Sequence, residues 1–552
     1  MKAKTKKFLV IASLVSLSAC GHDLGGYSEI KASGSNTESS TEEPIQFTNL
    51  LSSPGEMERG DILYIDFDAD GRALVDFEGA PEEAEFSLIV GTASTVSGSY
   101  SMFLSDNLAD LEGKEVQQFH PEDDTLGADI ANIQEEWDAT LRVREADISL
   151  QEPASLSLNA AKAATTGSAS VTLGDSETFR VLSSLSSTNA YVEVTATAEC
   201  VGSNVVFYVD DQVAESELPH DDVLNLCEKF DAIVAEEIAL FGDVSDINGD
   251  GYFDVLMTPQ VNRLGGMGGG IITGFFNASD LYPRSSGNPV SNGREILHVM
   301  VPDPTGRYGV QISRNFALSN LLPAVLPHEL QHAISYNQHV FMNKGQPEAS
   351  WLNEGLSHLA EDLMGQNQEN PSRYAIYLSN PASYPLVSAA SPGLGTRGAA
   401  YLFLRYLYEQ SEKGPAFIGR MLNTHLTGVT NIETAFDGRD PAFDQFGEFF
   451  WRWNVALVLT NRGITKDSRY VYRDRIQNSE TGSWSGVCIT CAADDNRGTI
   501  LSGMSELSYF GYHAPALLNT TAKVFDVTNA PSEMALDSNG VASAFGVLVR
   551  VR

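Results

Sequence analysis

Basic residues are scarce in this sequence. Its 552 residues include 35 Lys and Arg against 73 Asp and Glu, which gives a formal net charge of −38 at pH 7. A surface this acidic repels the phosphates of nucleic acids and of anionic lipid headgroups. We therefore expect no nucleic-acid partner and no electrostatic attachment to a membrane. The hydrophobic share of 42% still allows a sizeable core and excludes a wholly disordered chain.

Long apolar runs are absent beyond the first twenty residues. Four lysines between residues 2 and 7 precede a short apolar stretch at 8–16, and Leu-Ser-Ala then leads into Cys20. Such a short run fits a secretory signal and not a membrane-spanning helix. The ending resembles a bacterial lipobox, which implies removal of residues 1–19 and a lipid on Cys20; an ordinary signal peptide with a chance cysteine is the alternative. We expect a lipoprotein of the bacterial cell envelope, held at the outer membrane or cell surface by its N-terminal lipid.

Cysteine is also rare. The chain has five, and four of them follow Cys20: Cys200, Cys227, Cys488 and Cys491. An even number in an exported chain predicts two disulfides, most simply Cys200–Cys227 and Cys488–Cys491. A Cys-x-x-Cys pair can also be a redox motif or half of a zinc knuckle. Here the flanking residues are loop-like and no second pair or nearby His completes a metal site, so a structural bridge is favoured.

The pattern of the remaining chain predicts an α+β protein with several segments. Short alternating apolar runs indicate strands near both ends, and helical spacing appears between about 220 and 460. The sequence allows the N-terminal strand-rich segment to be a structural domain or a propeptide. The expected segments are a signal peptide (1–19), a flexible tether (20–45), a β-sandwich-like N-terminal domain (46–150), a linker (151–170), a mixed α+β domain (171–475) and a C-terminal β-rich segment (476–552).

One five-residue pattern predicts a metal site. Residues 328–332 read His-Glu-Leu-Gln-His in a segment with helical apolar spacing. On a helix, positions i and i+4 share a face, so His328 and His332 can bind one metal ion. Glu329 lies beside the pair and can act as the general base that takes a proton from the attacking water.

A third ligand is available on a second predicted helix. Glu354 lies on the polar face of that helix with His358 and Glu361, opposite a stripe of leucines. Two His and one Glu leave the fourth position of a zinc ion open, as in catalytic sites. His358 is the alternative fourth ligand, but we favour a supporting position for it because a fourth protein ligand would close the site.

These residues resemble a known family of enzymes. His-Glu-x-x-His at 328–332, followed by Asn-Glu-Gly at 353–355, resembles the gluzincin zinc metallopeptidases, and the surrounding residues are most similar to the hyicolysin-like secreted endopeptidases. The resemblance covers roughly 200–460. It implies a zincin-type core, with a mixed sheet, an active-site helix and a helical C-terminal subdomain, flanked here by small β modules. It also implies a Zn²⁺ cofactor, a polypeptide substrate, and an edge strand at 295–301 that pairs with the extended substrate.

The residue that stabilises the oxyanion stays open. Related aminopeptidases use a Tyr near a Gly-Ala helix start, and here Tyr401, Arg397 or Tyr384 can supply the donor. The Gly-x-Met-x-Asn motif with which aminopeptidases hold a free N-terminus is absent, which favours an endopeptidase.

A second cation site is predicted in a polar turn. Asp246, Asn248, Asp250 and Asp254 alternate along the chain, with Gly251 at the turn. This resembles the first half of a Ca²⁺-binding loop, although the distant bidentate Glu of an EF-hand is missing. A plain polar turn is the alternative.

The favoured function is a zinc endopeptidase, and the alternative is a non-catalytic surface binding protein on a zincin fold. Glu329 distinguishes them, since a pure binder has no need of a general base.

Overall fold

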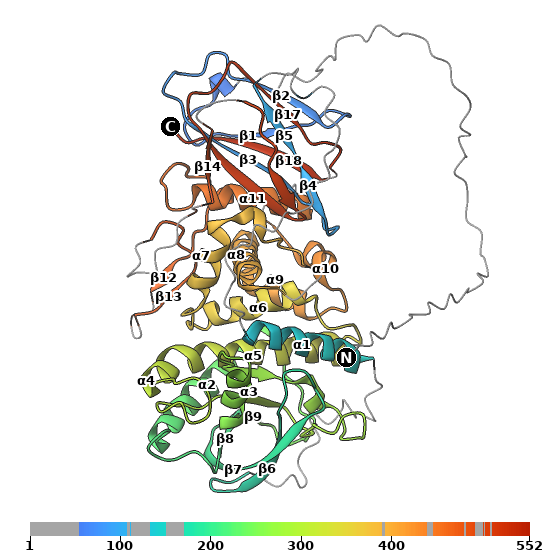
Figure 1. Ribbon diagram of the computed structural model, residues 1–552, viewed down its shortest axis with the longest axis vertical. Coiled ribbons are helices and arrows are strands. Elements are labelled where there is room, and N and C mark those ends of the chain that lie inside the picture. The colour runs from blue at the N-terminus through green and yellow to red at the C-terminus, as the bar shows by residue number, and fades with distance from the viewer. Residues whose placement is uncertain are drawn as a thin grey trace, which may run out of the picture. The chain divides into compact units, whose positions relative to one another are not determined.

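The described part of the chain is an α+β protein of helices and mixed sheets (Figure 1). No described helix is long and apolar enough to cross a bilayer. The signal peptide, the tether with Cys20, and the linker predicted at 151–170 lie outside the described residues. The computed structural model describes residues 54–106, 111, 133–150, 171–388, 392–438, 445–477, 479, 482–491, 501, 503–507, 511–541 and 543–552.

A six-stranded mixed sheet supports the metal-binding motif. Its order is β10-β11-β9-β8-β7-β6, with β8, β9 and β11 parallel and the other neighbours antiparallel. The edge beside the motif is β10, so the prediction that 295–301 is the edge strand is wrong: β11 lies inside the sheet, paired on both sides. The bounds are β6 (Ser176–Leu182), β7 (Tyr191–Val201), β8 (Val205–Asp210), β9 (Phe253–Met257), β10 (Gly274–Phe276) and β11 (Ile296–Val299).

Helices fill the segment between the mixed sheet and the C-terminal strands. α5 packs against α2, α6 and β10, and α6 packs against α8. Cys200 in β7 and Cys227 in α2 form a disulfide, and Cys488 and Cys491 form a second one. The bounds are α2 (His220–Phe241), α3 (Pro259–Met267), α4 (Arg314–Phe316), α5 (Leu322–Tyr336), α6 (Ser350–Leu363), α7 (Asn370–Ser379), α8 (Leu394–Gln410), α9 (Gly414–Leu422), α10 (Gly428–Ala435) and α11 (Phe446–Leu459).

The strands near the two chain ends share sheets. Figure 1 shows blue N-terminal strands interleaved with red C-terminal ones, in a five-stranded sheet of order β1-β18-β3-β16-β14 and a three-stranded sheet of order β2-β17-β5. The segments 46–150 and 476–552 are therefore not separate β modules. The bounds are β1 (Ile62–Ile65), β2 (Arg72–Asp76), β3 (Phe86–Thr92), β4 (Ser99–Ser101), β5 (Phe103–Ser105), β12 (Ile476–Gln477), β13 (Trp484–Ser485), β14 (Ser505–Leu507), β15 (Ala516–Leu518), β16 (Thr521–Val527), β17 (Glu533–Asp537) and β18 (Ala544–Arg550).

A helix follows the N-terminal strands. α1 (Ile133–Ser149) lies within the segment predicted to be β-sandwich-like, so that prediction is wrong for these residues. Its buried side chains include Trp137, Leu141 and Ile148, which recur at helical spacing. α1 packs against the 3-10 turn η4 (Ala278–Leu281) that follows β10. It is therefore part of the surroundings of the metal-binding motif.

Candidate metal centre

Helices α5 and α6 bring the three predicted ligands together. His328 Nε2 lies 3.5 Å from Glu354 Oε2, and His332 Nε2 lies 3.6 Å from Glu354 Oε1. The three residues are buried, and they form one of two groups among the described residues that can hold a metal ion. These distances are too long for good hydrogen bonds between the groups. The arrangement is therefore not explained by direct pairing of the three side chains.

The spacing fits a metal ion. With metal–ligand distances near 2.0–2.2 Å, the ligand atoms of a tetrahedral site stand roughly 3.3–3.5 Å apart. Glu354 is fully buried, yet its Oε1 accepts no hydrogen bond from the described residues. A buried carboxylate oxygen without a donor is costly unless something else compensates its charge. Arg397 pairs with the other oxygen, Oε2, and a cation between the three side chains would satisfy Oε1.

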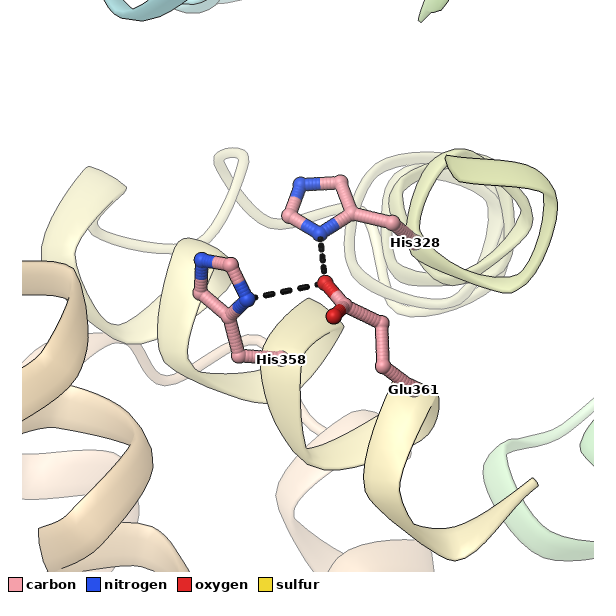
Figure 2. A group of neighbouring side chains, drawn as sticks. All are labelled: His328, His358 and Glu361. Atoms are coloured by element: carbon pink, nitrogen blue, oxygen red, sulfur yellow. Dashed lines mark hydrogen bonds and ion pairs between the residues drawn. The ribbon is translucent and has the colours of Figure 1, made fainter. Parts of the chain in front are cut away.

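The second candidate group has the distances of a hydrogen-bonded network. Glu361 Oε1 lies 2.7 Å from His328 Nδ1 and 2.8 Å from His358 Nδ1, and Figure 2 shows both rings directed at this carboxylate. These atoms are too close together to be ligands of one ion, whose ligand atoms would stand roughly 3.3–3.5 Å apart. Glu361 instead accepts the Nδ1 proton of His328, which leaves His328 Nε2 free to bind the metal, while His358 Nδ1 lies within ion-pair distance of the same oxygen. His358 therefore supports the site from behind.

Charge determines the protonation of these groups. Burial alone would lower the pKa of His328, but Glu354 and Glu361 raise it to about 10. Burial would raise the pKa of Glu361, but His358 and His328 lower it to about 2. Burial, followed by the charge of Arg142, holds the pKa of His332 well below its ordinary value. A metal ion at Glu354 would thus replace the proton of His328 as the balancing positive charge.

Glu329 is placed as a general base requires. Its side chain is 2% exposed and lines a small cavity together with His328. Its Oε2 accepts a hydrogen bond of 2.9 Å from Phe276 N in the edge strand β10. Burial raises the pKa of Glu329 to about 8, with Asp138 adding to the effect and His328 and Arg142 opposing it. A carboxylate whose pKa lies near neutrality can both accept and return a proton.

Of the three candidate oxyanion donors, Arg397 is the one that lines this cavity. Its Nη1 lies 2.9 Å from Glu354 Oε2, and its Nη2 donates to Asp138 Oδ2 at 2.9 Å. Tyr401 is buried elsewhere, stacked on Tyr374 at 5.9 Å. Tyr384 packs against Gly395.

The predicted calcium site does not assemble as expected. Asp254 is buried in β9, and its Oδ2 pairs with Arg294 Nη1 at 3.0 Å. In the turn itself, Asn248 Nδ2 donates to Asp250 Oδ2 at 2.6 Å, and Asp246 Oδ1 accepts from Gly251 N at 3.3 Å. Asp254 does not join the other three residues, because an inward strand position places its carboxylate beside the half-buried Arg294. The remaining groups satisfy one another as in a polar turn.

Several residues of the site were missed by the sequence analysis. Asp138 and Gln134, both from α1, line the cavity with Thr273. Helical spacing in α1 could have identified the helix, but nothing local indicates that it reaches a motif about 190 residues later. The sequence analysis placed Glu361 on the correct face of its helix but assigned it no role.

The comparisons add no family assignment. The chain matches no model of a known protein family and no curated protein. The functional argument therefore depends on the motif and on the geometry of the site.

Proposed function

We propose that this protein is a zinc-dependent endopeptidase of the gluzincin type that hydrolyses peptide bonds in polypeptides. The observation that carries the proposal is the convergence of His328, His332 and Glu354, with Glu329 on the cavity beside them. Two imidazoles and one carboxylate form a ligand set typical of catalytic zinc. The α+β core with a mixed sheet and the motif on α5 is compatible with a zincin fold.

Each residue has a chemical role in this proposal. A zinc ion held by the three ligands would polarise the scissile carbonyl and acidify the attacking water. Glu329 accepts the proton of that water and delivers it to the leaving amine. Arg397 fixes the orientation of Glu354 and offers positive charge near the developing oxyanion. The outward backbone groups of β10 pair with an extended substrate.

The location follows from the first twenty residues. We propose that Cys20 anchors the enzyme to the bacterial cell envelope through its lipid, with the catalytic part outside the cytoplasm. An oxidising compartment also suits the two disulfides.

Glu329→Gln separates an enzyme from a binding protein. The variant should keep zinc and fold, because glutamine has nearly the same volume and Glu329 is not a ligand. We expect its cleavage of an unfolded protein substrate to fall by roughly 10²–10⁴-fold, the usual contribution of general acid–base catalysis. Initial rates and zinc content, measured for both proteins at equal concentration, provide the test.

Two histidine variants complete this experiment. His332→Ala should lose zinc, whereas His220→Ala should retain it, since His220 pairs with Glu199 at the surface. Full zinc occupancy in His332→Ala would refute the ligand assignment. Equal cleavage by wild type and Glu329→Gln would favour the binding protein.

A further inference from the structure

The cavity beside the metal ligands is too small for a polypeptide. Its volume is about 40 Å³, room for only a few water molecules. Its lining includes Gln134 and Asp138, which α1 contributes. His328 is 7% exposed and Glu354 is fully buried. An endopeptidase has to admit an extended chain at this point, so something now occupies the substrate's place.

Gln134 of α1 pairs with the edge strand as a substrate would. Its Nε2 donates to Gly274 O at 3.0 Å, and its Oε1 accepts from Thr273 N at 2.8 Å. A side-chain carboxamide has the same donor and acceptor as a peptide group. These outward backbone groups next to Glu329 are those that β-augmentation by a substrate would use. Gln134 therefore stands where a substrate backbone would bind.

Other residues of α1 also contact the residues around the cavity. Trp137 is buried with its ring edge-on to Phe275 of β10, at 5.5 Å between centroids. Asp138 pairs with Arg397, which in turn contacts the ligand Glu354. Arg144 donates to Ser279 Oγ at 3.1 Å in η4. The helix thus contacts the edge strand, Arg397 and the turn after β10 at once.

The contact between α1 and the cleft nevertheless leaves buried polar atoms without hydrogen-bond partners, which is unfavourable for a permanent core contact. Arg142 and Glu145 are buried on α1 and pair with each other at 3.1 Å through Arg142 Nη2, but Arg142 Nε and Nη1 find no hydrogen-bond partner among the described residues. Buried charges of this kind oppose docking and favour release into water.

We propose that α1 is an autoinhibitory helix that occupies the substrate cleft and keeps the peptidase latent until it is displaced. This inference rests on the proposed function. The strands β1–β5 are not the inhibitor, since they form sheets with the C-terminal strands. Inhibition resides in α1 alone, which lies in the cleft without belonging to any sheet.

The test loosens α1 and follows access to the metal as well as cleavage. In Gln134→Ala/Trp137→Ala, loss of the strand-like pairing and of a buried ring should raise the open population at least about tenfold. Cleavage of an unfolded protein and removal of zinc by 1,10-phenanthroline should both accelerate by that factor. Val143→Ala is the matched control, because Val143 lies on the same helix and is 65% exposed. It should leave both rates unchanged.

The outcomes separate the inference from the proposed function. Unchanged cleavage and unchanged zinc removal in the folded double variant would overturn autoinhibition and leave the peptidase proposal intact. Faster zinc removal without any cleavage would support occlusion and refute the peptidase. Adding Glu329→Gln to the double variant should abolish the gain in cleavage but keep the gain in zinc removal. Should the double variant not fold, Gln134→Ala combined with Arg144→Ala spares the buried ring, and the same two rates decide the question.

Discussion

Helix α6 contributes to two buried charged clusters that differ in how completely their atoms are paired. Towards α8, Arg405 Nη1 lies 3.0 Å from Asp362 Oδ2 and Arg405 Nε lies 2.9 Å from Glu409 Oε1, while Asp362 Oδ1 accepts from Gly486 N at 2.8 Å. Towards α5, Glu354 Oε1 accepts no hydrogen bond from the described residues and faces a histidine nitrogen at 3.6 Å. Both clusters bury charge, so burial does not distinguish them. The difference is that a carboxylate oxygen lacks a donor in the proposed metal site, whereas the carboxylates around Arg405 are paired.

The largest effect is expected from a variant that breaks the cluster around Arg405. Arg405→Leu leaves Asp362 and Glu409 buried without their cation, so the free energy of unfolding should fall by about 3–5 kcal/mol. Urea unfolding followed by tryptophan fluorescence measures this loss. Zinc content should stay at the wild-type level, because Arg405 contacts none of the three proposed ligands.

A surface pair provides the control for this variant. Arg314 is 48% exposed in its pair with Asp222, and exposed pairs contribute about 0–1 kcal/mol. Arg314→Ala should therefore lower the unfolding free energy far less than Arg405→Leu does. If Arg405→Leu costs no more than this control, or if it loses zinc, the two clusters are not independent and the comparison fails.

The candidate metal centre and the terminal sheets differ in how far the sequence could predict them. His328, His332 and Glu354 lie within 27 residues on two amphipathic helices, so local spacing was sufficient to bring them together. The pairing of β1 with β18 joins Ile62 to Val549, and alternation in either strand cannot name a partner so distant. The same limit explains the errors at α1 and at the edge strand. β11 is as buried and apolar as expected, but only the complete sheet shows that β10 lies outside it.

Glu348 is a third buried carboxylate to compare with these two clusters, and its hydrogen-bond donors are neutral. Glu348 accepts from Gly428 N at 2.6 Å and Asn431 Nδ2 at 2.7 Å, and burial raises its pKa to about 7. His339 lies 3.7 Å away, but burial lowers its pKa to about 4, so it provides no charge in the relevant range. Glu348 therefore shows what a buried carboxylate does without a cation.

The pH dependence of stability follows from this raised pKa. Between pH 4.5 and 7 the folded chain retains a proton that the unfolded chain releases, so the stability that Glu348 contributes is lost as pH rises. Relative to Glu348→Gln, wild type should lose about 3 kcal/mol of unfolding free energy between pH 4.5 and 7, and the difference should be constant outside this range. Urea unfolding of both proteins at half-unit pH steps measures it. A difference that is flat throughout would contradict the prediction.

The smallest effect concerns the carboxylate that orients a ligand. Glu361 Oε1 accepts from His328 Nδ1 and lies 2.8 Å from His358 Nδ1, and a glutamine oxygen can accept the same bond, so Glu361→Gln removes charge while retaining geometry. The loss of that charge makes His328 a weaker ligand, and zinc affinity should fall ~10–100-fold. Competition with a chromophoric chelator at neutral pH measures the change. Glu369→Gln is the control, since Glu369 lines the same cavity but pairs with Arg373. Equal affinities in the two variants would mean that the charge of Glu361 does not act through His328, and Glu361 would then belong with the structural cluster around Arg405.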